Sequence, residues 1–160
     1  MKKTKLTLIA FSIFLLIGAL SVSATGGLTA LELRAQAREA ASEVRENRLE
    51  NKLIWAQNVE LRTQIKLKLI DIKENDVVLE ESVKTQLTEL KTQLQAKYTA
   101  LSDTKGDIKA LADGIKALIE AKDWTTLKTT YDSILAIQET RYALLTDING
   151  LLTQVNDLLP

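Results

Sequence analysis

The sequence contains no cysteine and no histidine, and its single proline is the last residue, Pro160. Without cysteine, no disulfide bond can stabilise the fold, and no thiolate is available as a nucleophile or a zinc ligand. Without histidine, the chain also lacks the commonest general base and metal ligand. We therefore expect no enzyme, no catalytic residues, no cofactor and no metal site. A hydrolase that uses carboxylates alone is the remaining enzymatic alternative.

The N-terminus has the three parts of a secretory signal peptide. A basic start at residues 2–5 precedes an apolar run over residues 6–20, and Ser21-Val22-Ser23-Ala24 supplies small residues before the expected cleavage in front of Thr25. An uncleaved anchor is the alternative, although the apolar stretch over residues 6–24 reaches only the lower end of the length that spans a bilayer. Both interpretations place residues 25–160, as a single domain, in the secreted fraction or the extracytoplasmic cell envelope.

Removal of residues 1–24 takes away three lysines and no acidic residue, which leaves a formal charge of −3. A nucleic-acid-binding protein needs a basic surface that neutralises phosphates, and neither this charge nor the predicted compartment favours one. No later stretch is apolar enough to cross a membrane. We expect no nucleic-acid partner and no membrane span after cleavage.

Little interrupts a helix beyond Gly27, because only Gly106, Gly114 and Gly150 follow among the glycines. Both phenylalanines and the only methionine precede residue 25, so aliphatic residues and alanine must build the core. We expect an all-α fold, an elongated antiparallel bundle of three long coiled-coil-like helices over about residues 29–73, 77–121 and 124–158. Thr29 with Glu32 fits a capping box, and Asp76 and Asp123 are the expected N-caps of the second and third helices.

The first helix carries a heptad seam, in which seam positions alternate four and three residues apart. Its members are Leu33, Ala37, Ala40, Val44, Asn47, Asn51, Ile54, Asn58, Leu61, Ile65, Lys68 and Ile72. The second half of this seam is aliphatic, whereas the alanine, valine and asparagine residues of its first half bury little apolar area. The first half therefore needs a partner surface.

The second helix has two interpretations, because five of the six residues 102–107 around Gly106 are weak helix formers. The heptad phase nevertheless continues unshifted from Leu101 through Thr104 to Ile108, which favours one continuous helix. The alternative fold has four helices with a break near Gly106. In that fold the first half of the first helix would project as an arm and require another chain.

The third helix carries a broad apolar stripe, which predicts burial on two sides. Its members are Leu127, Tyr131, Ile134, Gln138, Tyr142, Leu145, Ile148, Leu152, Val155 and Leu159. Leu145-Thr146-Asp147-Ile148-Asn149 and Leu152-Thr153-Gln154-Val155-Asn156 resemble the Leu-Thr-x-x-Gln elements of small exported helical chaperones of the Spy and CpxP type, with asparagine where those elements have glutamine. The resemblance implies a chaperone that binds unfolded clients on an apolar face.

Two charge stripes flank the seam in the first half of the first helix, at about 100° per residue. The basic stripe is Arg34, Arg38, Arg45, Arg48 and Lys52, and the acidic stripe is Glu32, Glu39, Glu43, Glu46 and Glu50. Like charges at i,i+4 weaken an isolated helix by a few tenths of a kcal/mol, about 0.2–0.5 per pair, and complementary stripes on another helix would offset this. A solvated face with no function is the alternative.

Trp55 and Trp124 are candidate aromatic anchors for a partner, with ordinary packing as the alternative. The residues that we predict to carry an interaction are Arg34, Arg38, Arg45, Arg48, Glu39, Glu43, Glu46 and Trp55. The sequence thus predicts an exported, non-enzymatic protein that acts through helix-helix contacts, with a protein partner or by self-association. The envelope chaperone is the alternative function.

Overall fold

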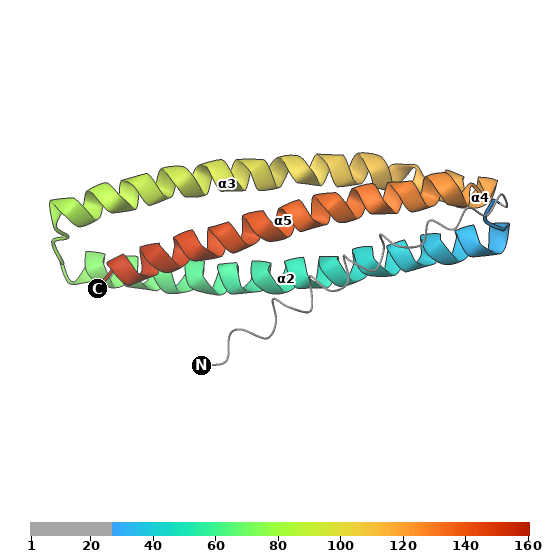
Figure 1. Cartoon of the computed structure of the whole chain (residues 1–160). Coiled ribbons are helices and arrows are strands. Elements are labelled where there is room, and N and C mark those ends of the chain that lie inside the picture. Colours follow the sequence, from blue (N-terminus) through green and yellow to red (C-terminus); the bar gives the residue numbers. More distant parts are fainter. Residues whose placement is uncertain (1–26) are drawn as a thin grey trace, which may run out of the picture.

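The computed structural model describes residues 27–160, so the predicted signal peptide lies outside the described residues. Within that part the chain is helical, with α2 (Ala30–Glu74), α3 (Glu81–Asp113), α4 (Ile115–Ala121) and α5 (Trp124–Leu158). Figure 1 shows three long rods in which α3 and α4 together form the second. The predicted all-α bundle of three long helices is confirmed, and α2 and α5 begin and end within a residue of their predicted bounds.

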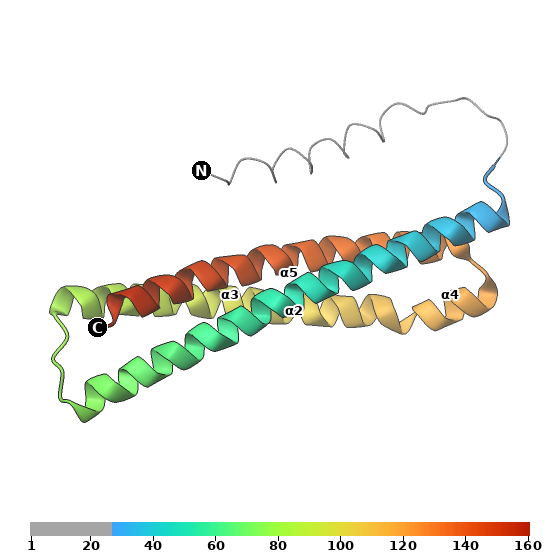
Figure 2. The same cartoon turned by 90° about the horizontal axis from the view of Figure 1, so that it is seen from below.

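Helix α5 lies between α3 and α2 in Figure 1 and contacts α2, α3 and α4, and Figure 2 shows α2 crossing obliquely. By contrast, no Cα atom of α2 lies within 8 Å of a Cα atom of α3. Helices α2 and α5 run in the same direction and α3 runs in the opposite one. The helices therefore form an open layer around α5, which is buried on both sides, as its broad apolar stripe predicted. Tyr142 is the exception in that stripe, with 40% of its surface exposed.

The heptad seam of α2 faces α5, and each of its twelve members is buried or half-buried. Its polar members bond to the main chain of α5. Asn51 Nδ2 donates to the Gln138 carbonyl oxygen at 2.9 Å, and Asn58 Nδ2 donates to the Leu145 carbonyl oxygen at 2.9 Å. These pairs repeat after one heptad on both helices. They fix the register of α2 on α5, which is the role that buried asparagines have in coiled coils.

Near the C-terminus of α5, Lys68 Nζ donates to the carbonyl oxygens of Asn156 and Leu159 at 2.8 and 2.9 Å. A cation at this position satisfies orphan carbonyls and complements the helix dipole. The lysine in an otherwise aliphatic part of the seam is therefore a cap for the neighbouring helix.

Helix α3 continues through Gly106, so the predicted continuity is confirmed and the break near Gly106 is wrong. Arg141 Nη1 of α5 donates to the Leu101 carbonyl oxygen at 3.1 Å and to Thr104 Oγ1 at 2.6 Å. This contact holds the weak segment in helical form. The helix is instead interrupted at Gly114. Because the φ of −84° and ψ of −15° of Gly114 remain in the right-handed helical region, α4 continues in the direction of α3 (Figure 1).

The start of the second helix was predicted wrongly, because α3 begins at Glu81 and its N-cap is Glu80 rather than Asp76. Asp76 has a φ of 50°, and the Val77 N–H donates to the Ile72 carbonyl oxygen at 2.9 Å. This is a Schellman motif, in which a left-handed residue ends the helix. Asp76 therefore terminates α2 and cannot take the extended conformation of an N-cap.

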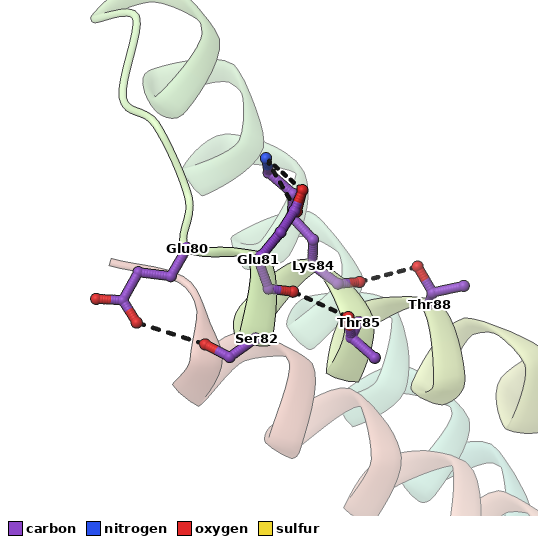
Figure 3. A network of polar contacts seen from close by, with 6 residues as sticks. All are labelled: Glu80, Glu81, Ser82, Lys84, Thr85 and Thr88. Atoms are coloured by element: carbon purple, nitrogen blue, oxygen red, sulfur yellow. Dashed lines mark hydrogen bonds and ion pairs between the residues drawn. The ribbon is translucent and has the colours of Figure 1, made fainter.

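Figure 3 shows how the first turns of α3 are held in the absence of a side-chain cap. Ser82 Oγ donates to Glu80 Oε2 at 3.4 Å, and Lys84 Nζ pairs with Glu81 Oε2 at 3.4 Å. The hydroxyls of Thr85 and Thr88 donate to carbonyl oxygens four residues earlier. All these contacts are local and exposed, so they shape this end without anchoring it to α5.

The other two predicted caps are present. The Glu32 N–H donates to Thr29 Oγ1 at 3.3 Å and the Thr29 N–H donates to Glu32 Oε2 at 2.7 Å, which completes the capping box. The Thr126 N–H donates to Asp123 Oδ1 at 3.1 Å at the start of α5. These hydrogen bonds lower the pKa of both carboxyl groups below their ordinary values.

The apolar core is concentrated toward the C-terminal ends of α2 and α5. Its buried members are Ile65, Leu101, Leu145, Ile148, Leu152 and Leu159. Side chains of α2 and α3, such as Leu61 and Leu94, pack against this cluster. We call this part of the bundle the closed half. No helix among residues 27–160 is both long and apolar enough to cross a membrane.

Candidate interaction groove

The opposite half of the bundle contains a groove between α2 and α3–α4, with α5 as its floor. Two hollows of about 700 and 250 Å³ adjoin at Tyr131 and together form it. From α2 it is lined by Arg34, Ala37, Arg38, Ala41, Val44, Arg45, Arg48, Asn51, Lys52 and Trp55. From the other helices it is lined by Lys105, Ile108, Ala112, Ile115, Ile119, Trp124, Leu127, Tyr131, Ile134, Gln138, Arg141 and Leu145. We call it the basic groove.

The groove follows from the short side chains in the first half of the α2 seam. Ala37 and Ala40 are almost fully buried against α5, with 2% and 4% of their surfaces exposed. They are too short to reach α3–α4 across α5. In the closed half, longer seam residues such as Ile54 and Leu61 pack against the buried apolar core instead. The gap therefore stays open where the seam changes from isoleucine and leucine to alanine and asparagine.

Every charged residue that lines the basic groove is cationic. There are seven of them: Arg34, Arg38, Arg45, Arg48, Lys52, Lys105 and Arg141. None of the seven forms an ion pair with another residue in the described range 27–160. Because the chain after residue 24 has a formal charge of −3, this concentration of positive charge is local and opposes the overall balance.

Two of these cations have partners of another kind. The Arg34 guanidinium lies over the Trp124 ring, with Cζ 5.5 Å from the ring centroid, a geometry typical of a cation-π contact. Arg141 of α5 donates hydrogen bonds to the Leu101 carbonyl oxygen and to Thr104 Oγ1 of α3, and burial lowers its pKa. The other five guanidinium and ammonium groups project from exposed residues.

The predicted site residues separate into two groups in the structure. Arg34, Arg38, Arg45, Arg48 and Trp55 all line the groove, so the structure brings them together. Glu39, Glu43 and Glu46 are exposed on the other flank of the seam and do not line it. None of these three carboxylates forms an ion pair among the described residues; Glu46 Oε1 only accepts a hydrogen bond from Ser42 Oγ at 3.4 Å.

The first half of α2 is not a projecting arm, because its seam packs on α5 as the buried Ala37 and Ala40 show. The charge stripes therefore flank a helix interface that is already formed within the chain. Only the basic stripe borders unfilled space.

Aromatic residues line the groove along its length. Trp55 keeps 43% of its surface exposed, Trp124 is half-buried under Arg34, and Tyr131 is half-buried between the two hollows. Tryptophan, tyrosine and arginine are the residues most enriched at the energetic centres of protein interfaces. The groove thus combines side chains suited to a protein contact with an open surface.

Of the residues that the other helices bring to the groove, the sequence pointed to Trp124 as a candidate aromatic anchor but not to Lys105, Ile108 or Arg141 as site residues. Lys105 and Ile108 come from the segment around Gly106, and Arg141 lies beside the predicted stripe of α5. The heptad phase of α3 placed Ile108 on the seam. No local pattern says that Lys105 and Arg48 border the same space, because that depends on how two helices sit on a third.

Among residues 27–160 no group of three or more acidic residues is arranged to hold a metal ion. No protein-family model, no curated protein and no solved structure matches the chain. The function is therefore inferred from the groove itself.

Proposed function

We propose that this chain is an exported, non-enzymatic interaction protein that acts through helix-helix contacts, with the basic groove as its contact surface. The observation that carries the proposal is the row of seven cationic side chains, without ion-pair partners among residues 27–160, along a groove that is also lined by apolar residues. Export rests on the pattern of residues 1–24, a basic start followed by an apolar run and small residues.

The clustering of cations has an energetic cost that a partner would remove. Arg34 and Arg38, like Arg48 and Lys52, are four residues apart on α2, where like charges repel by about 0.2–0.5 kcal/mol per pair. A partner that supplies carboxylates converts this repulsion into attraction and speeds the encounter of the two proteins. The apolar floor and the tryptophans supply the area that stabilises a complex.

A charge-reversal experiment tests the proposal. The full chain is expressed in the source cells, and mass spectrometry of the recovered protein tests for an N-terminus at Thr25. The variant Arg38→Glu/Arg45→Glu/Arg48→Glu is compared with Glu39→Lys/Glu43→Lys/Glu46→Lys, which reverses as many charges on the other flank of α2. The readouts are cross-linking to partner proteins in the cells, and molar mass by size-exclusion chromatography with light scattering over protein and salt concentrations.

We expect the arginine reversal to abolish an association that the glutamate reversal leaves intact. Circular dichroism confirms that both variants are still helical. If both variants associate like the natural chain, the charges of α2 have no part in binding and the proposal is wrong. If both variants lose association equally, the two stripes pair with one another between copies of the chain.

The second candidate is an envelope chaperone, and the groove floor is the observation that favours it. The leucines and isoleucines of α5 that suggested this function are mostly buried, among them Leu145, Ile148 and Leu152. Within the groove, the apolar side chains that stay accessible to unfolded clients include Ile108, Ile115 and Trp55, while exposed residues such as Leu49 and Leu53 of α2 lie outside it. Suppression of client aggregation that is lost in Ile115→Asp would support the chaperone over a specific partner.

A further inference from the structure

We infer that the basic groove receives one amphipathic helix of a protein partner, with acidic residues on both flanks of its apolar stripe. The helix lies along α5 between α2 and α3–α4 and completes a four-helix arrangement. This inference rests on the proposed function and specifies the partner's chemistry.

The dimensions of the groove fit a helix. Its lining on α2 extends from Arg34 to Trp55, which at a rise of about 1.5 Å per residue is roughly 30 Å, the length of a helix of about 20 residues. Its long axis runs along helices that lie lengthwise beside one another in Figure 1, with α2 crossing α3 obliquely in Figure 2. Four-helix bundles place helices side by side at small crossing angles in this way. A helix therefore fills the space with the packing that the chain already uses.

The floor determines the apolar part of the partner. Ile108 and Ile115 of α3–α4 line the larger hollow and are half-buried, and Tyr131 joins it to the smaller one, whereas Ile134 and Leu145 of α5 are almost fully buried beneath them. A helix buries a stripe of residues at i, i+3, i+4 and i+7 in such a groove. The partner therefore presents leucine-like or isoleucine-like residues at heptad spacing.

The walls determine the charged part. Arg45 and Arg48 belong to the α2 wall and Lys105 belongs to the α3 wall. A helix between these walls has cations on both sides, so carboxylates on both flanks of its stripe are the complementary pattern. Interspersed basic residues on either flank would be repelled, which makes the charge pattern a basis for selectivity.

Two other sources of a helix fit less well. Residues 1–26 contain Lys2, Lys3 and Lys5 and no acidic residue, so this segment has the charge sign of the groove. A second copy would present the acidic flank of its α2, but the seam beside Glu39 and Glu43 is already buried on α5. The acidic helix of a different protein meets neither obstacle.

The test uses designed helical peptides of about 21 residues, a length set by the groove. The first has leucine and isoleucine at a and d and glutamate on both flanks. The second has lysine in place of those glutamates, and the third has the first peptide's composition in scrambled order. Binding to the recovered protein is followed by tryptophan fluorescence, because the only two tryptophans, Trp55 and Trp124, both line the groove.

The variants are Arg45→Glu/Arg48→Glu in the groove and Lys66→Glu/Lys73→Glu as a matched control. Lys66 and Lys73 are exposed residues of α2 that do not line the groove. We expect the acidic amphipathic peptide to bind one to one and to bind more weakly as salt is raised. The groove variant should lose roughly tenfold or more in affinity while the control changes little. The lysine peptide should not bind.

Other results overturn the inference in distinguishable ways. Equal binding of the scrambled peptide would mean general attraction of acidic chains and no helix recognition. Displacement of the acidic peptide as the protein dimerises would assign the groove to a second copy. If no peptide binds while the arginine reversal still abolishes natural association, the helix partner is wrong and the proposed function stands. If neither peptide binding nor natural association depends on the arginines, both are wrong.

Discussion

The two halves of the bundle share the same central helix but differ in what covers it. In the closed half, Ile148 of α5 is fully buried under side chains of α2 and α3. In the other half, α2 rests on α5 through alanines, and the space beside it is the basic groove. The comparison shows that the buried apolar core and the open groove are located in different parts of one continuous helix layer. The size of the seam side chains decides which part serves which role.

The largest expected effect comes from truncating matched isoleucines of α5 in the two halves. Ile148→Ala should destabilise the fold by about 2–5 kcal/mol, because it removes a fully buried side chain and leaves a cavity. Ile134→Ala should fall at the lower end of that range, because Ile134 borders the groove and its surroundings can relax. Urea denaturation of both variants measures the difference. Equal losses would contradict the division into halves.

The next effect concerns the buried asparagines that fix the register. Asn58 is 1% exposed, and Asn149 Nδ2 donates to its Oδ1 at 2.8 Å. Asn58→Ala should cost about 1–3 kcal/mol, because it removes the buried hydrogen bond to the Leu145 carbonyl and leaves the half-buried Asn149 amide without this acceptor. Asn51→Ala should cost less, since Asn51 lines the groove. If urea denaturation shows a larger loss of stability for Asn51→Ala than for Asn58→Ala, the asparagine that matters more for the register of α2 on α5 lies in the half with the basic groove.

A smaller effect separates helix propensity from packing. A Cβ atom added at Gly106 in α3 or at Gly150 in α5 meets no atom within 4 Å, and neither glycine has a positive φ. Gly106→Ala and Gly150→Ala should each stabilise the protein by roughly 0.5–1 kcal/mol. Similar gains in thermal stability at both positions would show that the two halves differ in side-chain packing and not in helix propensity. A loss at either position would reveal a steric demand absent from the described fold.

The smallest expected effect is a pH dependence of helix stability at the starts of α2 and α5, which the carboxylates of Glu32 and Asp123 cap. Hydrogen bonds from Thr29 hold the pKa of Glu32 below its ordinary 4.5, and those from Thr126 hold the pKa of Asp123 below its ordinary 3.8. A lowered folded pKa stabilises the fold above the ordinary value, and this contribution is lost as pH falls through the folded pKa. Amide hydrogen exchange between pH 5 and pH 3, about the range of these carboxyls, should therefore show fraying first at residues 30–34 and 124–128.

The variants Glu32→Gln and Asp123→Asn are the controls for this acid effect. Each removes one titrating carboxyl, so its helix start should lose the pH dependence that the unchanged start keeps. Fraying that begins in the closed half instead would mean that other groups determine the acid response.

Much of this fold can be predicted from local patterns. The capping box at Thr29 and Glu32 depends on residues that are neighbours in the chain, and the seam of α2 depends on a repeat that any helix must follow. Asp76 was misassigned because aspartate is favoured at N-caps and also tolerates the left-handed conformation that ends a helix. The choice between the two depended on the Schellman hydrogen bond from Val77 to Ile72.

Of the two walls of the candidate site, only the one formed by α2 could be predicted from the sequence. The arginines of α2 lie within one helix, and their shared flank follows from about 100° per residue. Lys105 and Arg141 are more than fifty residues away along the chain, and they join the arginines only through the packing of three helices. The acidic stripe looked equivalent in sequence, and the structure distinguishes the two stripes because only one of them borders a groove.

The sequence by itself determined the helical class, the ends of α2 and α5, the seam that faces α5 and the presence of two charge stripes on α2. These properties depend on hydrogen bonds and periodicities within one helix. The tertiary structure decided that α5 is central, that the layer stays open between α2 and α3–α4, and that the basic stripe faces the opening. Those properties depend on side-chain volumes meeting across helices far apart in the chain, which no local pattern encodes.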